Sequence, residues 1–278
     1  MQNTSIYHDI ATRTGGDIYL GLVGPVRTGK STFIKRFMET LVIPNIEDVY
    51  ARERAKDELP QSGSGRTIMT AEPKFVPEDA VNVTLDGGVS FSVRLIDCVG
   101  YMVDGASGQF EDGAERMVAT PWFDEEVPMS RAAEEGTRRV ITDHSTIGIV
   151  MTTDGSVCGI ERESYVPAEE RVVGELREIG KPFVLVLTSA DPTGEAAQEL
   201  RAELADKYGV ACVCVNCLNL TAEDIDEILK LALYEFPIAE LGIYLPSWLD
   251  ALGADSPLRE GMLSGIAEAV QGMSRVRD

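Results

Sequence analysis

The chain has 278 residues, of which 44% are hydrophobic and 26% are charged, and its formal net charge is −21. This composition is sufficient for one large globular domain or for one domain plus an appendage, and so acidic a surface argues against non-specific binding to nucleic acid. No apolar run is long enough to cross a bilayer and the N-terminus lacks the features of a signal peptide, so we expect a cytoplasmic protein without direct membrane insertion.

A phosphate-binding loop is predicted near the start of the chain. An apolar run at residues 18–23 is typical of a buried parallel strand, and it leads into Gly24-x-x-x-x-Gly29-Lys30-Ser31. The apolar residues that follow recur at helical spacing. In this strand–loop–helix setting the glycines allow a tight bend, and the helix directs its positive N-terminal end and free N–H groups at the bound anion.

The residues of this loop have separate expected tasks. Lys30 can reach the β- and γ-phosphates of a nucleotide, and the Ser31 hydroxyl can bind Mg²⁺. The residues expected to contact the nucleotide here are Gly24, Pro25, Val26, Arg27, Thr28, Gly29, Lys30, Ser31 and Thr32.

Further along, a polar stretch at residues 45–69 is expected to be a mobile loop. Apolar residues alternate on both sides of residues 86–88 and predict a hairpin, whose second strand ends in Asp97-Cys-Val-Gly100. Phosphate-loop enzymes place an acid on the metal at the end of such a strand. We therefore expect Asp97 to hold Mg²⁺ through water and the Gly100 N–H to face the γ-phosphate, with a bare turn as the alternative.

Two other groups of the site are expected from their positions in the chain. Thr67-Ile-Met-Thr70 lies where translation-factor-type GTPases place a threonine that senses the γ-phosphate, so Thr67 and Thr70 are both candidates, with a solvated loop threonine as the alternative. Thr188-Ser-Ala-Asp191 follows a predicted strand, where GTPases carry Asn/Thr-Lys-x-Asp to recognise guanine. Asp191 either contacts the base or caps the next helix, and Ser189 in place of the lysine makes guanine selectivity doubtful.

Tyr101 follows the Asp-x-x-Gly motif, at the position where GTPases of this class carry the Gln or His that orients water. Hydrolysis is therefore expected to be slow, or to use a group from another segment or another molecule. The connection at residues 101–130 is long for a loop and suggests a functional role. Residues 103–129 are our candidate for contact with a neighbouring subunit, and an ordinary solvated acidic loop is the alternative.

Strands and helices alternate through the second half of the chain. Helices are predicted at residues 131–143, 169–179, 195–208 and 221–235, and strands at 146–151, 183–188 and 210–215. This alternation predicts an α/β P-loop NTPase fold, with a mainly parallel sheet covered on both faces and one antiparallel hairpin strand. Residues 247–278 are predicted to form a separate helical appendage, so the expected domains are 1–246 and 247–278.

The chain has five cysteines, an odd number, so they cannot all be paired in intrachain disulfides. This agrees with the expected location in the cytoplasm, where cysteines are usually reduced. Cys212, Cys214 and Cys217 cluster, but no second pair or nearby histidine completes four zinc ligands. We interpret them as core residues of a buried strand.

Longer stretches of the chain carry a family resemblance. They include residues 9–21 and 26–35, Asp57-Glu-Leu-Pro-Gln-Ser62, Thr67-Ile-Met-Thr70, Asp97-Cys-Val-Gly-Tyr101, His144-Ser-Thr-Ile-Gly148, Leu233-Tyr-Glu-Phe-Pro237 and Leu245-Pro-Ser-Trp248. In these stretches the chain resembles the N-terminal part of the stage IV sporulation protein A family, the spore-coat morphogenetic ATPases of endospore-forming bacteria. Family members continue well beyond this length, so the chain is expected to be a shortened member.

The resemblance implies a domain related to translation-factor GTPases that has turned to ATP, with Mg²⁺ as cofactor. It implies self-assembly, driven by hydrolysis, into a polymer that forms the basement layer of the spore coat on the mother-cell face of the forespore outer membrane. It also implies a small membrane-bound spore protein and other coat proteins as partners. It favours Thr70 as the sensor, although Ala71 stands where the family has a second threonine.

Lys30, Thr70 and Asp97 are accordingly the expected catalytic residues, and Ser31, Thr70 and Asp97 are the expected metal ligands. Two other functions stay open at this point. Asp191 keeps open a regulatory GTPase, and Tyr101 keeps open a structural subunit that binds nucleotide with little turnover.

Overall fold

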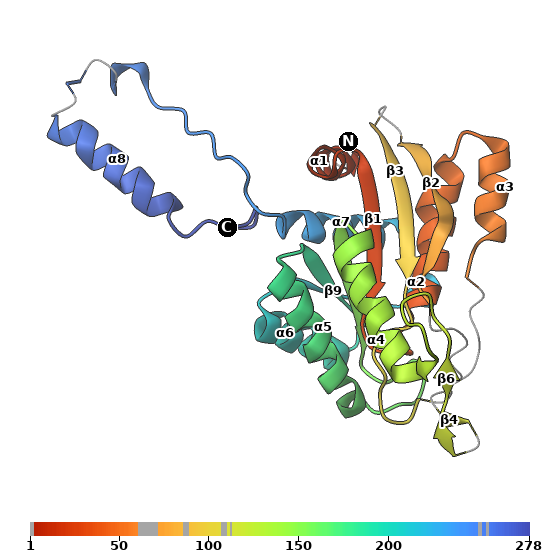
Figure 1. The fold of residues 1–278 in the computed structure, drawn as a ribbon. Coiled ribbons are helices and arrows are strands. Elements are labelled where there is room, and N and C mark those ends of the chain that lie inside the picture. Colours follow the sequence, from red (N-terminus) through yellow and green to blue (C-terminus); the bar gives the residue numbers. More distant parts are fainter. Residues whose placement is uncertain are drawn as a thin grey trace. The chain divides into compact units, whose positions relative to one another are not determined.

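A six-stranded sheet organises the larger part of the chain (Figure 1). Its strands are β1 (Asp17–Val23), β2 (Lys74–Leu85), β3 (Val89–Asp97), β8 (Ile147–Thr153), β9 (Phe183–Thr188) and β10 (Cys212–Val215), in the order β10-β9-β8-β1-β3-β2. Every residue of β8 and β9 is buried, as expected for apolar strands covered on both faces. Only β2 pairs antiparallel with its neighbour, β3, which confirms the predicted hairpin and the mainly parallel α/β fold.

This computed structural model describes residues 3–60, 72–85, 89–106, 110–111, 113–249, 252–253 and 256–278. The chain divides into two compact units, Met1–Leu233 and Tyr234–Asp278. The predicted domain boundary between residues 246 and 247 stays a prediction, because compact units need not coincide with domains that fold alone.

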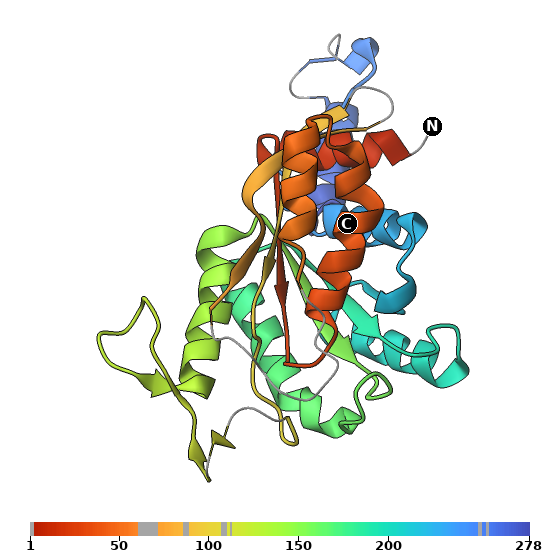
Figure 2. The same ribbon diagram turned by 90° about the vertical axis from the view of Figure 1, so that its right-hand side faces the viewer.

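Helices cover both faces of the sheet (Figure 2). The α-helices of the first unit are α1 (Asn3–Thr14), α2 (Lys30–Phe37), α3 (Val49–Asp57), α4 (Met129–Arg139), α5 (Val166–Ile179), α6 (Glu195–Tyr208) and α7 (Ala222–Tyr234). Ala132 of α4, Val172 of α5 and Leu204 of α6 belong to one buried cluster, so these three helices share a face. Right-handed crossovers place α2 on the opposite face.

Shorter helical turns extend or connect these elements. They are the π-helices Met38–Val42 and Val140–His144 and the 3₁₀ turns Ile43–Asn45, Arg162–Tyr165 and Cys217–Asn219. The predicted helices of the second half agree with α4 to α7 to within a few residues, and α6 agrees at both ends. Helices α5 and α6 each end at a left-handed glycine, Gly180 and Gly209.

Two parts of the first unit differ from the prediction. Helix α3 lies within the stretch expected to be a mobile loop, which was therefore wrong for these residues, while residues 61–71 lie outside the described part of the chain. The Asp48 carboxylate caps α3 by accepting hydrogen bonds from the Tyr50 and Ala51 N–H groups. Helix α1 was not predicted at all, and its buried Tyr7 stacks on Phe91 with ring centroids 5.7 Å apart.

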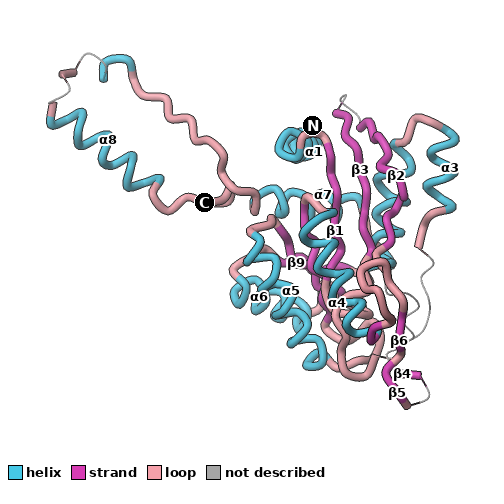
Figure 3. The backbone as a smooth tube through the Cα atoms, viewed as in Figure 1, coloured by secondary structure: helices cyan, strands magenta, loops and turns pink. Residues whose placement is uncertain are grey.

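The expected insert at residues 103–129 is only partly exposed. It contains two short hairpins, β4 (Phe110–Glu111) with β5 (Ala114–Glu115) and β6 (Met117–Val118) with β7 (Val127–Pro128) (Figure 3). Phe110 and Met117 are exposed, but Val103, Val127 and Met129 are buried. The core therefore anchors both ends of the insert.

The second unit is closed by pairing between its first and last residues. The Ile238 N–H donates to the Ser274 carbonyl and the Val276 N–H to the Phe236 carbonyl, both at 3.0 Å. The buried Glu235 carboxylate forms ion pairs with Arg275 and Arg277. These contacts hold the two ends of the unit together.

The predicted helix at residues 247–278 is shorter than expected. Only α8 (Pro257–Val270) is α-helical, after one 3₁₀ turn at Ser247–Leu249. Helix α8 begins at Pro257, because proline fits the first turn of a helix but interrupts one that starts earlier in the chain. The helix is therefore shorter than predicted. Four apolar residues of α8 recur at four-residue spacing, of which Leu258 is 57% exposed and Met262, Ile266 and Val270 are half-buried. In the described parts of the chain, no helix combines the length and apolar character that a bilayer crossing requires.

A buried carboxylate joins three elements of the first unit. Glu169 of α5 is fully buried, and its oxygens accept hydrogen bonds from the Thr152 hydroxyl at 2.5 Å and the Tyr208 hydroxyl at 2.7 Å. Arg162 forms an ion pair with the same carboxylate at 2.8 Å. All three donors would lose a buried partner if Glu169 were removed.

We therefore expect Glu169→Ala to lower the free energy of unfolding by about 3–5 kcal/mol, the cost of breaking a buried pair from one side. Its neighbour Glu170 supplies a matched control, because it pairs with Lys207 on the exposed surface. Glu170→Ala should cost about 0–1 kcal/mol. Urea denaturation followed by circular dichroism measures both, and equal losses would contradict the assigned role of Glu169.

Candidate nucleotide-binding site

The carboxyl ends of the parallel strands meet at one edge of the sheet, which is where ligands bind in open α/β folds. Strand β1 lies between β3 and β8, and Leu22 pairs with Asp97 in the register of β1 and β3. The phosphate loop that follows β1 is thereby placed beside the acid that ends β3. The sequence motifs are some 70 residues apart, and the parallel pairing brings them together.

The phosphate loop has a strained and closely packed backbone. Gly24 has φ 133°, and a Cβ built there would overlap the Met151 carbonyl oxygen of β8, so only glycine fits. Arg27 is the non-glycine residue with positive φ, at 66°, in the described part of the chain. Such a conformation costs of order 1–3 kcal/mol and persists where the surrounding structure imposes it, often at functional sites.

Lys30 is held inside the loop that precedes it. Its side chain is buried, and its Nζ donates to the Pro25 carbonyl at 2.6 Å and lies 3.4 Å from the Gly24 carbonyl. Burial lowers the pKa of the Lys30 ammonium, because removal from water disfavours its charge. A phosphate bound in the loop would place a negative charge beside this ammonium and stabilise its charged form.

Asp97 and Ser31 form the group that fits a metal ion. The Ser31 hydroxyl donates to Asp97 Oδ2 at 2.6 Å, while the buried Asp97 Oδ1 has no hydrogen-bond partner among the described residues. Burial raises the pKa of the Asp97 carboxyl. The hydrogen bond from Ser31 and the charge of Lys30 lower it, but the effect of burial is larger. Carboxylate and hydroxyl oxygens are ligands that Mg²⁺ accepts, so this pair would hold the ion.

The Asp-x-x-Gly segment lies directly on the phosphate loop. The Tyr101 N–H donates to the Gly24 carbonyl at 3.2 Å, and the Val26 N–H donates to the Tyr101 carbonyl at 2.9 Å. A Cβ on Gly100, whose φ is 92°, would overlap the Gly24 carbonyl and lie 2.7 Å from Lys30 Nζ. Glycine is therefore required at position 100 for the two segments to meet.

Thr188 belongs to the site but was not among its predicted residues. Its hydroxyl lies 3.0 Å from the Thr28 carbonyl in the phosphate loop and 3.0 Å from the Thr152 carbonyl at the end of β8. The Thr188 hydroxyl donates its single hydrogen to one of these carbonyls at a time, and so connects the phosphate loop with the ends of β8 and β9. The signal was available, since Thr188 is the first residue of the segment from which Asp191 was selected.

Asp191 is exposed at the start of the connection to α6. Its carboxylate accepts a hydrogen bond from the Thr193 hydroxyl at 3.1 Å, and Gly194 is the N-cap residue of α6. The alternative of Asp191 as the helix cap was therefore wrong. Contact with a base stays a prediction. Ser189, which replaces the GTPase lysine, is buried and accepts a hydrogen bond from the Asp191 N–H at 3.1 Å.

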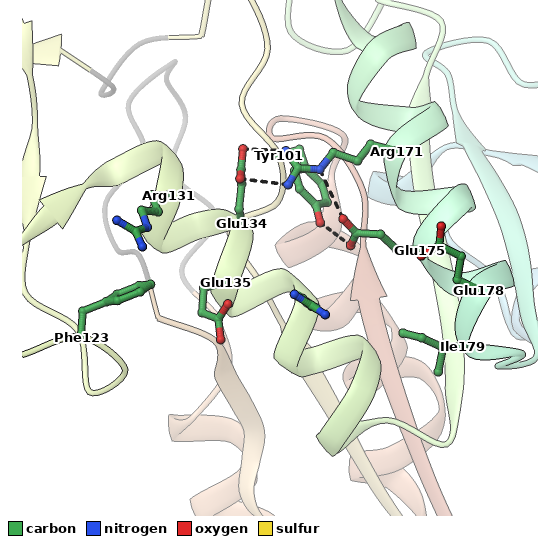
Figure 4. Close-up of a pocket in the computed structure, with 10 residues that line it drawn as sticks. Tyr101, Phe123, Arg131, Glu134, Glu135, Arg171, Glu175, Glu178 and Ile179 are labelled. Atoms are coloured by element: carbon green, nitrogen blue, oxygen red, sulfur yellow. Dashed lines mark hydrogen bonds and ion pairs between the residues drawn. The ribbon is translucent and has the colours of Figure 1, made fainter.

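Tyr101 does not face the phosphate site as a water-orienting residue would. Its buried side chain lies between α4 and α5, and its hydroxyl donates to Glu175 Oε2 at 2.5 Å (Figure 4). The structure thus brings together Gly24, Lys30, Ser31, Asp97 and Gly100, whose roles stay predictions. Thr67 and Thr70 lie outside the described residues, so their proposed sensing role also stays a prediction.

The raised pKa of Asp97 gives a test of the metal site. At neutral pH the ionised carboxylate opposes folding, since its pKa lies above the unfolded value, and Asp97→Asn removes this cost while Ser31 can still donate to the amide oxygen. We expect the ligand-free variant to have a Tm no lower than the parent. At Mg²⁺-nucleotide concentrations of about 100 Kd the parent should gain about 2.7 kcal/mol of stability and the variant little of it.

Differential scanning fluorimetry with and without Mg²⁺ measures these changes. Asp206→Asn is the control, because Asp206 is an exposed carboxylate on α6. A stabilisation by Mg²⁺-nucleotide that is the same in Asp97→Asn as in the parent would show that Asp97 does not hold the metal.

Comparisons with known proteins identify the family. The model of the stage IV sporulation protein A ATPase domain matches residues 1–237. The chain is 50% identical over 276 residues to stage IV sporulation protein A of Clostridioides difficile (strain 630), which covers 99% of this chain. It is 49% identical over 278 residues, its full length, to the proteins of that name from Bacillus anthracis and Bacillus subtilis (strain 168).

In each case the match covers 56% of the relative's length, so the chain spans little more than half of these proteins. The fold, the phosphate loop and the matches over the whole chain agree with the resemblance seen in the sequence. The chain belongs to the stage IV sporulation protein A family, and residues 1–237 match its ATPase domain.

Proposed function

We propose that this protein binds ATP with Mg²⁺ and hydrolyses it slowly to ADP and phosphate. The observation that carries the proposal is the burial of Lys30 beside a hydroxyl–carboxylate pair, Ser31 and Asp97, at the phosphate loop. Lys30 is bound to a backbone carbonyl and Asp97 Oδ1 has no hydrogen-bond partner among the described residues, so a metal-bound triphosphate would supply charge and ligands to both. The ATPase name of the family model supports ATP as the nucleotide.

The residues of the site would act mainly by position and charge. Lys30 would leave the Pro25 carbonyl and neutralise charge on the β- and γ-phosphate oxygens, and the loop N–H groups would orient the same oxygens. Bound Mg²⁺ would neutralise further charge between these phosphates. Asp97 and Ser31 would fix its place.

Slow turnover is proposed because the side chain after Asp-x-x-Gly is engaged elsewhere. The Tyr101 hydroxyl is bound to Glu175 and does not orient water at the phosphate loop. This observation also favours the second candidate, a nucleotide-binding structural subunit with little turnover. A regulatory GTPase is disfavoured, because Ser189 is too short to pack along a guanine base as the GTPase lysine does.

We further propose that hydrolysis drives self-assembly of the protein into the basement layer of the spore coat. The sporulation name of the relatives supports a morphogenetic role. The resemblance supports a site on the mother-cell side of the forespore outer membrane, with a small membrane-bound spore protein and other coat proteins as partners.

Lys30→Ala tests nucleotide binding. A hydrogen bond from a charged donor contributes about 1.5–3 kcal/mol, so we expect ATP affinity to fall about 10- to 100-fold and phosphate release to cease. Lys35→Ala on the same helix is the matched control and should keep both. Competition with a fluorescent ATP analogue measures affinity, and ATP should displace it at lower concentration than GTP. If GTP displaces the analogue at tenfold lower concentration than ATP, the nucleotide is wrongly assigned.

Assembly has a separate test. Light scattering should rise with ATP and Mg²⁺ and stay low with a non-hydrolysable analogue and in Lys30→Ala, because hydrolysis is proposed to drive assembly. Phosphate release per molecule should rise with protein concentration if neighbouring subunits complete the site. Equal scattering in all three samples would reject assembly driven by nucleotide.

A further inference from the structure

A groove of about 440 Å³ lies between α4 and α5, on the side of the first unit where Tyr101 ends (Figure 4). Charged side chains of both helices line it, together with Phe123 of the insert and the Tyr101 ring. Tyr101 is thus the residue that joins this groove to the phosphate site, because its backbone belongs to the segment that follows Asp97 and Gly100.

Helix α5 binds the Tyr101 side chain directly, and α4 is linked to it through Arg171. Glu175 of α5 accepts its hydroxyl hydrogen at 2.5 Å, and the Arg171 guanidinium, also on α5, lies 4.5 Å from its ring centroid. Arg171 in turn donates to both oxygens of Glu134 on α4, at 2.7 and 2.9 Å. Burial raises the pKa of the Tyr101 hydroxyl, so it remains a hydrogen-bond donor across the physiological pH range.

The backbone of the same residue binds the phosphate loop. Gly24 O accepts from the Tyr101 N–H at 3.2 Å and lies 3.4 Å from Lys30 Nζ, so the two donors share one acceptor. Val26, whose N–H donates to the Tyr101 carbonyl, is itself a loop residue. Movement of Lys30 toward a phosphate would therefore leave the Gly24 carbonyl to the Tyr101 N–H alone.

We propose that Tyr101 is a positioning residue that couples nucleotide in the phosphate loop to the groove between α4 and α5. Its backbone senses the loop, and its hydroxyl and ring transmit the change to Glu175 and to the Arg171–Glu134 pair. The side chain thereby also holds the Asp97–Gly100 segment in place for hydrolysis. This inference rests on the proposed function, since it requires ATP binding.

The chain contains a reporter for this coupling. It has two tryptophans, Trp122 and Trp248, and Trp122 lies in the insert, where Arg139 of α4 packs over its ring at 5.5 Å. Arg139 is paired with Glu135 on the groove at 2.8 Å. Trp248 lies in the second unit, so Trp248→Phe leaves Trp122 as the single reporter of the position of α4.

In the Trp248→Phe background, a non-hydrolysable ATP analogue with Mg²⁺ should shift Trp122 emission. Tyr101→Phe removes the hydroxyl and keeps the ring, and Glu175→Gln weakens the acceptor. Each should reduce the shift by at least half and the double variant no further, because both changes act on the same Tyr101–Glu175 hydrogen bond. Each should also lower kcat about 3- to 10-fold with KM within about twofold, as expected for loss of one charge-assisted bond that positions the site.

Glu178→Gln is the matched control, because Glu178 lines the same groove on α5 and should keep both the shift and kcat. Calorimetric titration of the analogue distinguishes failure of the proposed function from failure of the coupling alone. If the analogue does not bind the parent, the proposed function and the coupling both fail. If it binds and Trp122 does not respond, or responds equally in Tyr101→Phe, only the coupling is overturned.

Discussion

The phosphate site depends on two opposite charges that are buried close together but bound to other groups. Lys30 is held by the Pro25 carbonyl and Asp97 by the Ser31 hydroxyl. Burial lowers the pKa of the first and raises that of the second, so each charge is disfavoured where it stands. A metal-bound phosphate, as proposed, would supply further opposite charge and ligands to both groups. Binding would then offset part of the free-energy cost of burying them, because the site is already arranged for its ligand.

The sequence predicted an element of the fold well where neighbouring residues determine it, and poorly where residues distant in the chain determine it. Strand β9 and helix α6 agree with the prediction at both ends, because an apolar run and a stop glycine mark them locally. Helix α3 was missed because it is polar, with only Ala55 buried, and its signal is one capping aspartate. Helix α1 depends on contacts such as the 2.5 Å bond from Tyr7 to Asp226, which no local pattern reveals.

The candidate site shows the same division. The loop motif and the acid at the end of β3 were sufficient to select Lys30, Ser31 and Asp97, because residue type and spacing decide their chemistry. The orientation of Tyr101 was not predictable, since it depends on Glu175, which lies 74 residues further along the chain. A position in a motif predicts where a backbone goes, whereas packing against other elements decides where its side chain points.

The end of the family match also has a physical meaning. The match stops at residue 237, within the pairing between residues 234–238 and 274–277 that closes the second unit. A chain cut at this point would keep Glu235 but lose Arg275 and Arg277, its two ion-pair partners. The end of the match at residue 237 therefore lies inside this set of contacts and does not mark the boundary between the two compact units, which falls at residues 233 and 234.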